Sequence, residues 1–379
     1  MRARNKKLHS SVISFVKEVK YWRDTGKANY LKIAKKHIKS IGKTIGLDDK
    51  FLQYSESLAL YESILYPLPG YRSHYVHQLN VFLNGYLILN WLDDSQFTKI
   101  QKIIARMCNV EEDSIDVFKI WFITAIFHDT GYPLGKVGDW TQYFLGELFK
   151  RTFDNIASSI VEPLSISLFR GSFRESINLL IQHLFTWLRP SDSQQKIINH
   201  EIHELFFKTL SENLIPGLIL IRAAETSGID ICTLSTAVSA IVLDDERMCE
   251  ILKKEKIKKQ MSYVDHPLAF LLIYCDNIQE YGRVKSILSN QIVERQGKLP
   301  EVDEFEVKEQ KLSMEENVIH CRLSYKKQPD IWNTKVRPIL SSIREYWKSP
   351  SDLTFGISYE TNDGEFDNLI FLRGPTKSR

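Results

Sequence analysis

Apolar residues recur at helical spacing along most of the first 300 positions of the chain. The stretch 8–46 shows this period twice, which predicts one or two amphipathic helices. The region 140–262 also has a mostly helical pattern, with breaks at 188–193 and near Gly228. The other predicted helices cover 73–92, 114–128 and 266–283.

The pattern changes after about Gly297, where apolar and polar residues tend to alternate. A period of two is typical of half-buried strands, and it places four residues on one face: Ile319, Cys321, Leu323 and Tyr325. The predicted strands lie at 304–310, 318–326, 353–360 and 367–373, with a helix at 329–347. We therefore predict a mainly α protein with a small C-terminal α+β appendage. Its predicted parts are a basic helical segment (1–60), a helical body (61–297) and a small α+β domain (298–379).

Charge is unevenly distributed along the 379 residues. The net charge is +3, yet residues 1–43 hold thirteen Lys or Arg against Glu18 and Asp24, a net of +11 that leaves −8 for the rest. A basic segment on an acidic body suits phosphates, so nucleic acid is one partner to consider for residues 1–43. The alternative is that the segment pairs with the acidic body or with a sister subunit in a homo-oligomer. We favour this alternative, because no nucleic-acid motif accompanies the charge.

The cysteines and the apolar runs bear on where the protein works. Five cysteines are scattered without a CxxC pair, which argues for a reducing compartment and against a disulfide framework or a cysteine zinc site. No apolar run approaches the roughly 18 residues that a membrane-spanning helix needs. We therefore expect a cytoplasmic protein with no membrane contact.

Three of the predicted helices carry ionisable side chains where apolar residues are expected. Such groups at the edge of a core are costly unless they are hydrogen-bonded, paired or bound to a metal. Imidazoles and carboxylates together suit Mn, Fe, Co, Ni or Zn better than calcium. In chain order these residues are His74, His77, His128, Asp129 and Asp276.

The adjacent pair His128-Asp129 follows the mostly apolar run VFKIWFITAIF. Consecutive residues on a helix point about 100° apart, so a neighbouring pair can seldom serve one site from mid-helix. It can do so near a helix end, and Gly131 and Pro133 indicate that the helix stops here. The pair therefore either caps a helix end or binds a metal.

The order of His77, then His128-Asp129, then a distant Asp276 resembles the H…HD…D signature of the HD superfamily of metal-dependent phosphohydrolases. Three stretches carry the resemblance over about residues 70–285, and they read RSHYVHQLNVFLNG, FHDTGYP and PLAFLLIYCDNIQEYGR. The resemblance implies an HD-type helical bundle in which these four residues bind a divalent metal. Asp129 would be the bridging carboxylate if there are two ions.

Some branches of that family add two histidine ligands. The stretch NHEIHELF supplies His200 and His203, of which His200 is the preferred match. The second histidine usually follows the pattern AI-x-x-H, and Asp244 stands at that place. This departure leaves open whether one or two ions bind.

Several residues near the proposed ligands could act on a substrate. Lys136 and Arg283 are cationic and could hold a substrate phosphate. Arg72 and His74 could also line the site, although His74 could equally be a packed structural histidine. With Asp129, the two cations Lys136 and Arg283 form the predicted catalytic set.

The activity that the resemblance implies is hydrolysis of a phosphate ester, with a nucleotide as the preferred small phosphorylated substrate. A metal-activated water would attack phosphorus. No GxSxG motif or phosphate-binding glycine loop competes for the role. Two alternatives remain: an HD-type nuclease, which the basic segment would suit, and a non-catalytic ligand-sensing module whose appendage contacts a partner.

Overall fold

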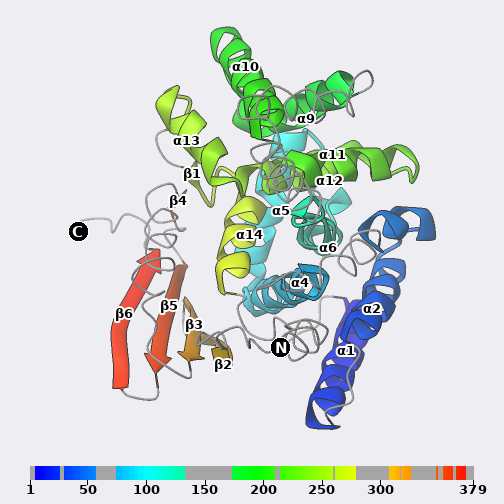
Figure 1. Ribbon diagram of the computed structural model, residues 1–379, viewed down its shortest axis with the longest axis vertical. Coiled ribbons are helices and arrows are strands. Elements are labelled where there is room, and N and C mark those ends of the chain that lie inside the picture. The colour runs from blue at the N-terminus through cyan, green and yellow to red at the C-terminus, as the bar shows by residue number, and fades with distance from the viewer. Residues whose placement is uncertain are drawn as a thin grey trace, which may run out of the picture.

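The computed structural model shows a mainly α chain with a small sheet at its C-terminal end (Figure 1). Its helical body lies between the α1–α2 pair on one side and the sheet on the other. The residues that the structure describes are 5–25, 30–56, 74–132, 173–209, 214–258, 261–278, 307–315, 317–325, 347–348, 353–361 and 364–372.

Helices occupy most of the described residues up to 278. They are α1 (Lys6–Thr25), α2 (Tyr30–Thr44), α4 (His74–Trp91), α5 (Asp94–Cys108), the short 3-10 helix η1 (Glu112–Ser114), α6 (Val117–Phe127), α9 (Phe173–Leu188), α10 (Asp192–Thr209), α11 (Leu214–Glu225), α12 (Ile231–Leu243), α13 (Glu246–Lys254) and α14 (Pro267–Ile278). They confirm the predicted helices and both breaks within the described ranges. None of them is long and apolar enough to cross a membrane.

Helix α6 lies at the centre of the helical body. All of its residues except Lys119 are buried. A helix that is apolar on every side has to be covered on every side, and α4, α11, α12 and α14 pack around α6. Helix α14 also contacts α4. The three helices that carry the candidate ligands are therefore mutual neighbours.

The contact between α4 and α6 depends on a glycine. A Cβ atom added to Gly85 would lie 2.1 Å from Cζ2 of Trp121. The indole of Trp121 is fully buried, and its Nε1 donates a hydrogen bond to the carbonyl of Phe82 at 2.9 Å. The ring therefore has no room to move aside, and the close approach of the two helices requires glycine.

A Gly85→Ala variant should lose at least about 3 kcal/mol of unfolding free energy, at the upper end of the usual cost of overpacking a core. Urea unfolding followed by circular dichroism would measure the loss. Gly217→Ala is the matched control, because its Cβ would lie 2.9 Å from the flexible tip of Leu180 and otherwise at ordinary contact distance, 3.5 and 3.7 Å, from Val242 and Val238. Equal stability of the two variants would contradict this account of the α4–α6 contact.

Helices α1 and α2 pack against each other, and α2 packs on α4. Part of their basic charge is paired locally. Lys36 lies 2.7 Å from Glu18, and Asp49 lies 3.3 Å from Lys39 and 3.0 Å from Lys43. These three lysines are therefore paired within the N-terminal segment itself. For the other basic residues of this segment, pairing with the acidic body or with a sister subunit stays a prediction.

The C-terminal sheet confirms the alternating pattern after Gly297. Its strands are β2 (Val307–Glu315), β3 (Val318–Tyr325), β5 (Thr354–Thr361) and β6 (Gly364–Leu372), in the spatial order β2-β3-β5-β6. The central pair β3–β5 is parallel and the outer pairs are antiparallel. The predicted first strand, 304–310, ends too early, since β2 continues to Glu315, and positions 304–306 lie outside the described residues. The helix predicted at 329–347 lies outside the described residues except for Trp347, which begins β4 (Trp347–Lys348).

The sheet shares a core with the helical body. Strand β1 (Met261–Ser262), just before α14, pairs in parallel with β4. On α14 itself, the Tyr274 hydroxyl donates to the carbonyl of Gly356 at 3.0 Å. The rings of Phe270 and Tyr274 meet the Phe355 ring with centroids 4.9 and 4.8 Å apart. One side of α14 is therefore covered by the sheet.

One expectation from the cysteines is wrong. A disulfide joins Cys108, at the end of α5, to Cys232, at the start of α12. The two cysteines are 124 residues apart and meet because α5 packs on α12, which sequence spacing alone does not reveal. The remaining three cysteines are free and buried. The cysteines therefore no longer support a reducing compartment.

Candidate metal centre

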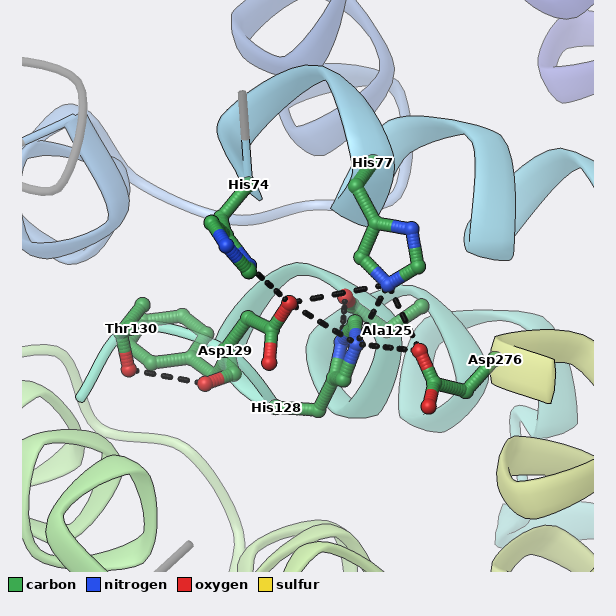
Figure 2. Close-up of polar contacts among 8 residues, drawn as sticks. His74, His77, Ala125, His128, Asp129, Thr130 and Asp276 are labelled. Carbon is green, nitrogen blue, oxygen red and sulfur yellow. Dashed lines mark hydrogen bonds and ion pairs between the residues drawn. The ribbon is translucent and has the colours of Figure 1, made fainter. Parts of the chain in front are cut away.

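Three helices bring four of the predicted ligands together (Figure 2). His77 comes from α4, and His128 and Asp129 come from the end of α6. One nitrogen or oxygen of each of these three residues lies within 4.8 Å of the others. From α14, Asp276 places its Oδ1 2.6 Å from His77 Nε2 and 3.5 Å from His128 Nε2. The four side chains therefore lie side by side, with Asp276 against the three residues of the metal-capable cluster, and their role as metal ligands stays a prediction.

The end of α6 explains how two adjacent residues can face one site. The helix ends at Phe127, and His128 is its C-cap residue. The backbone nitrogen and the Oγ1 of Thr130 lie 3.0 and 2.7 Å from the Phe127 carbonyl, so the chain turns directly after the helix. This turn brings Asp129 Oδ2 to 3.7 Å from His128 Nε2.

A backbone contact orients the ring of His128. Its Nδ1 lies 2.7 Å from the Ala125 carbonyl, which can only accept a hydrogen bond, so Nδ1 carries a proton. In the neutral ring Nε2 then presents its lone pair, and it faces His77 Nε2 at 3.4 Å. A hydrogen bond through the nitrogen that does not bind metal is the usual arrangement of a metal-binding histidine.

The charges of the cluster favour a cation among the side chains. Burial lowers the pKa of His128, but the carboxylates of Asp129 and Asp276 outweigh burial and raise this pKa to about 9. Burial would raise the pKa of Asp129, yet the imidazoles of His128 and His74 hold it well below its usual range. Hydrogen bonds from His128 and His77 likewise outweigh burial and lower the pKa of Asp276. At neutral pH the two carboxylates are therefore ionised, and a proton on His128 supplies the positive charge.

Asp244 adds a further carboxyl group near the cluster. It is the C-cap residue of α12. Burial raises its pKa well above the usual range, and the carboxylates of Asp276 and Asp129 raise it further. Among the described residues Asp244 is thus a candidate for an additional carboxyl group at this end of the site. The metal-capable cluster found among the described residues does not include it, and its role as a ligand stays a prediction.

The residues that converge here could hold a metal ion. The nitrogens of His77 and His128 and the Oδ2 of Asp129 stand 3.4, 3.6 and 3.7 Å apart. Ligand atoms about 2.1 Å from one tetrahedral ion stand roughly 3.4 Å from one another. Two imidazole nitrogens and one carboxylate oxygen form a mixed N/O donor set, and Asp276 Oδ1 makes a 2.6 Å contact with one of these nitrogens, His77 Nε2.

The other predicted site residues lie elsewhere or outside the described residues. His200 is exposed on α10 and is not part of the described metal-capable cluster. His203, one turn further on, has its Nδ1 2.7 Å from the carbonyl of Asn199 on the same helix. Lys136 and Arg283 fall outside the described ranges. The proposed roles of His200, Lys136 and Arg283 stay predictions.

Sequence reasoning left His74 undecided and did not single out Tyr132. The structure places His74 Nδ1 2.8 Å from Asp129 Oδ2 (Figure 2). The His74 ring also stacks on Tyr132, with ring centroids 3.6 Å apart. The sequence did carry one signal that His74 lies at the site. It is three residues from His77, and residues three apart share a helix face.

The chain was also compared with known proteins. No protein-family model, no curated protein and no solved structure matches it. The case for a metal centre therefore depends on the convergence of His77, His128, Asp129 and Asp276 in the structure itself.

Proposed function

We propose that this protein is a metal-dependent phosphohydrolase that cleaves a phosphate ester bond of a nucleotide. The observation that carries the proposal is the meeting of His77, His128 and Asp129 from two helices, with Asp276 against both imidazoles. Their donor atoms suit one or two ions of Mn, Fe, Co, Ni or Zn. The resemblance of these residues to the H…HD…D signature supports the same chemistry.

The residues of the site have separable roles in this proposal. His77, His128, Asp129 and Asp276 would hold a divalent metal, which would supply a water of lowered pKa and charge stabilisation for a phosphoryl oxygen. His77 and His128 offer neutral nitrogens, and the carboxylates of Asp129 and Asp276 offset the charge of the ion. Lys136 and Arg283 are proposed to hold the phosphoryl oxygens and to stabilise their charge during attack. No protein nucleophile is needed.

Metal affinity should rise with pH in this site. Below about pH 9 His128 is protonated in the metal-free protein, so a metal ion has to displace that proton. We expect the dissociation constant for Mn²⁺ or Co²⁺ to fall about tenfold per pH unit between pH 7 and 8.5, and to level off near pH 9.

Isothermal titration calorimetry in buffers of different ionisation enthalpy would measure both the affinity and the proton released. About one proton should leave per ion bound at pH 7. A dissociation constant that stays flat from pH 7 to 8.5, with no proton released, would contradict the assignment of His128 as a ligand.

The direct test of the function is a metal and substrate screen. Protein stripped with a chelator would be reloaded with Mn, Fe, Co, Ni or Zn. It would then be assayed against nucleoside monophosphates and triphosphates, cyclic nucleotides, a generic phosphodiester, and single-stranded DNA and RNA. We expect metal-dependent release of phosphate or cleavage of a diester from a nucleotide. Tight metal binding without hydrolysis would favour a non-catalytic sensing module, and failure to bind any of the five metals would overturn the proposal.

The same screen separates a nucleotide substrate from nucleic acid. Lys6, Lys7 and Lys17 lie exposed on α1, and a nuclease would use such charges to hold the phosphate backbone. The apparent KM for DNA or RNA would then increase steeply with salt, because bound counterions are released from nucleic acid on binding. A nucleotide substrate should show only a shallow salt dependence.

A further inference from the structure

His74 is held between two side chains that belong to the turn after α6. Its Nδ1 lies 2.8 Å from Asp129 Oδ2, and its ring stacks on Tyr132 at 3.6 Å with an interplanar angle of 25°. The residue is only 8% exposed, although it begins α4. A single histidine thus links the first turn of α4 to the segment that carries two candidate ligands.

The direction of this hydrogen bond follows from the acceptor. An aspartate carboxyl is ordinarily ionised at neutral pH, and the oxygen of Asp129 that faces His74 Nδ1 at 2.8 Å is Oδ2. An ionised carboxylate can only accept, so the proton of the bond lies on Nδ1 of His74. The same Oδ2 lies 3.6 Å from His77 Nε2 and 3.7 Å from His128 Nε2. One oxygen atom therefore accepts from His74 and also faces the candidate metal centre.

We propose that His74 is a positioning residue, whose Nδ1–H fixes the Asp129 carboxylate with Oδ2 directed at His77 and His128. This inference depends on the metal centre of the proposed function and adds a residue that acts through one of its ligands. A carboxylate oxygen has two lone pairs, so Oδ2 can accept from His74 and still bind an ion.

Asp129 needs a positioning residue because of where it lies in the chain. Asp129 follows the last turn of α6, where its own helix no longer restricts the side chain. Its side chain is 20% exposed, so water could compete for the carboxylate and allow it to rotate away. A hydrogen bond from the buried, stacked ring of His74 keeps the Asp129 side chain in one rotamer. Losing an outer hydrogen bond of this kind typically weakens metal affinity by about 10- to 100-fold.

The test compares metal affinities of four full-length proteins, measured by titrating the chelator-stripped protein with Co²⁺ and following its visible absorption. His74→Leu keeps bulk but removes the donor. His74→Asn places an amide N–H close to the position of Nδ1, so it should restore the bond. His183→Asn is the matched control, because His183 is equally buried at 7% exposure and its Nδ1 makes a 2.8 Å contact, but to Ser235.

We expect His74→Leu to bind Co²⁺ about 10- to 100-fold more weakly than the wild type, and His74→Asn to recover most of that loss. The absorption bands of bound Co²⁺ should keep their positions in His74→Asn, since no ligand is exchanged. His183→Asn should bind as the wild type does. If His74→Leu does not fold, His74→Gln takes its place, because its longer side chain moves the amide away from Oδ2.

Two results would overturn the inference while leaving the metal centre intact. One is wild-type affinity in His74→Leu. The other is an equal loss in His74→Leu and His74→Asn with shifted Co²⁺ bands, which would make His74 a direct ligand. A wild-type protein that binds no Co²⁺, Mn²⁺ or Zn²⁺ would instead remove the proposed function, and the inference with it.

Discussion

An Asp129→Ala protein should retain its fold, lose its tightly bound metal and show no measurable hydrolysis. The carboxylate faces both imidazole nitrogens of the cluster at 3.6 and 3.7 Å, so its removal leaves one fewer anionic ligand and an unbalanced positive charge. We expect the rate to fall by roughly 10³-fold or more, since a ligand and its charge are lost together. Metal content by mass spectrometry and the rate on the best substrate of the screen would be measured on the same sample.

Asp116→Ala is the control for this substitution. Asp116 caps the opposite end of the same helix, where its Oδ1 accepts from the Lys119 backbone at 3.0 Å. Its loss should cost about 1 kcal/mol of stability without affecting metal. An Asp129→Ala protein with full activity and full metal content would end the enzyme hypothesis in this form. Loss of both properties in Asp116→Ala would show that the assay reports only stability.

A protein truncated after residue 297 should not fold into a stable helical body. Phe270 and Tyr274 on α14 are each 2% exposed, and Phe355 of the sheet packs against both. Exposing the two rings to water should lower the free energy of unfolding by about 3–6 kcal/mol. This is a large share of the roughly 5–15 kcal/mol by which a typical domain is stable. Because Asp276 follows Tyr274 on the same helix, metal binding should be lost as well.

Thermal unfolding of the truncated chain, with metal content measured alongside, checks this expectation. A point variant gives the same test in the full chain. Phe355→Ala should cost about 3–5 kcal/mol, whereas Arg322→Ala, exposed on β3, should change stability by less than about 0.5 kcal/mol. A truncated protein that melts cooperatively near the wild-type temperature would contradict the core shared by α14 and the sheet.

Local pattern was sufficient for much of the fold. The apolar run before His128 predicted a buried helix, and α6 is that helix. The alternation of Ile319, Cys321 and Leu323 predicted one buried strand face, and all three are fully buried. Helix α5 was not assigned, although Asp93 and Gln96 form a capping box at its start, a signal that sequence carries.

Long-range contacts were the part that periodicity could not supply. The pairing of β1 with β4 joins positions 261 and 347, and the sequence of a two-residue strand does not indicate which strand it pairs with. Cys108 and Cys232 meet for the same reason, through packing of helices far apart in the chain. The four candidate ligands were selected because a family resemblance supplied their long-range order, whereas the contact of His74 with Asp129 became apparent only in the structure.

The ligands of the candidate centre differ greatly in their separation along the chain. His128 and Asp129 are neighbours, His77 lies 51 residues before His128, and Asp276 lies 199 residues after His77. Each doubling of a loop adds about 0.6 kcal/mol to the entropy cost of closing it, so the contact with Asp276 is the hardest to form in an unfolded chain. An ion therefore has little to bind until α4, α6 and α14 have assembled. Metal uptake should be a late event in folding, and a bound ion should then slow the separation of α14 from α4 when the protein unfolds.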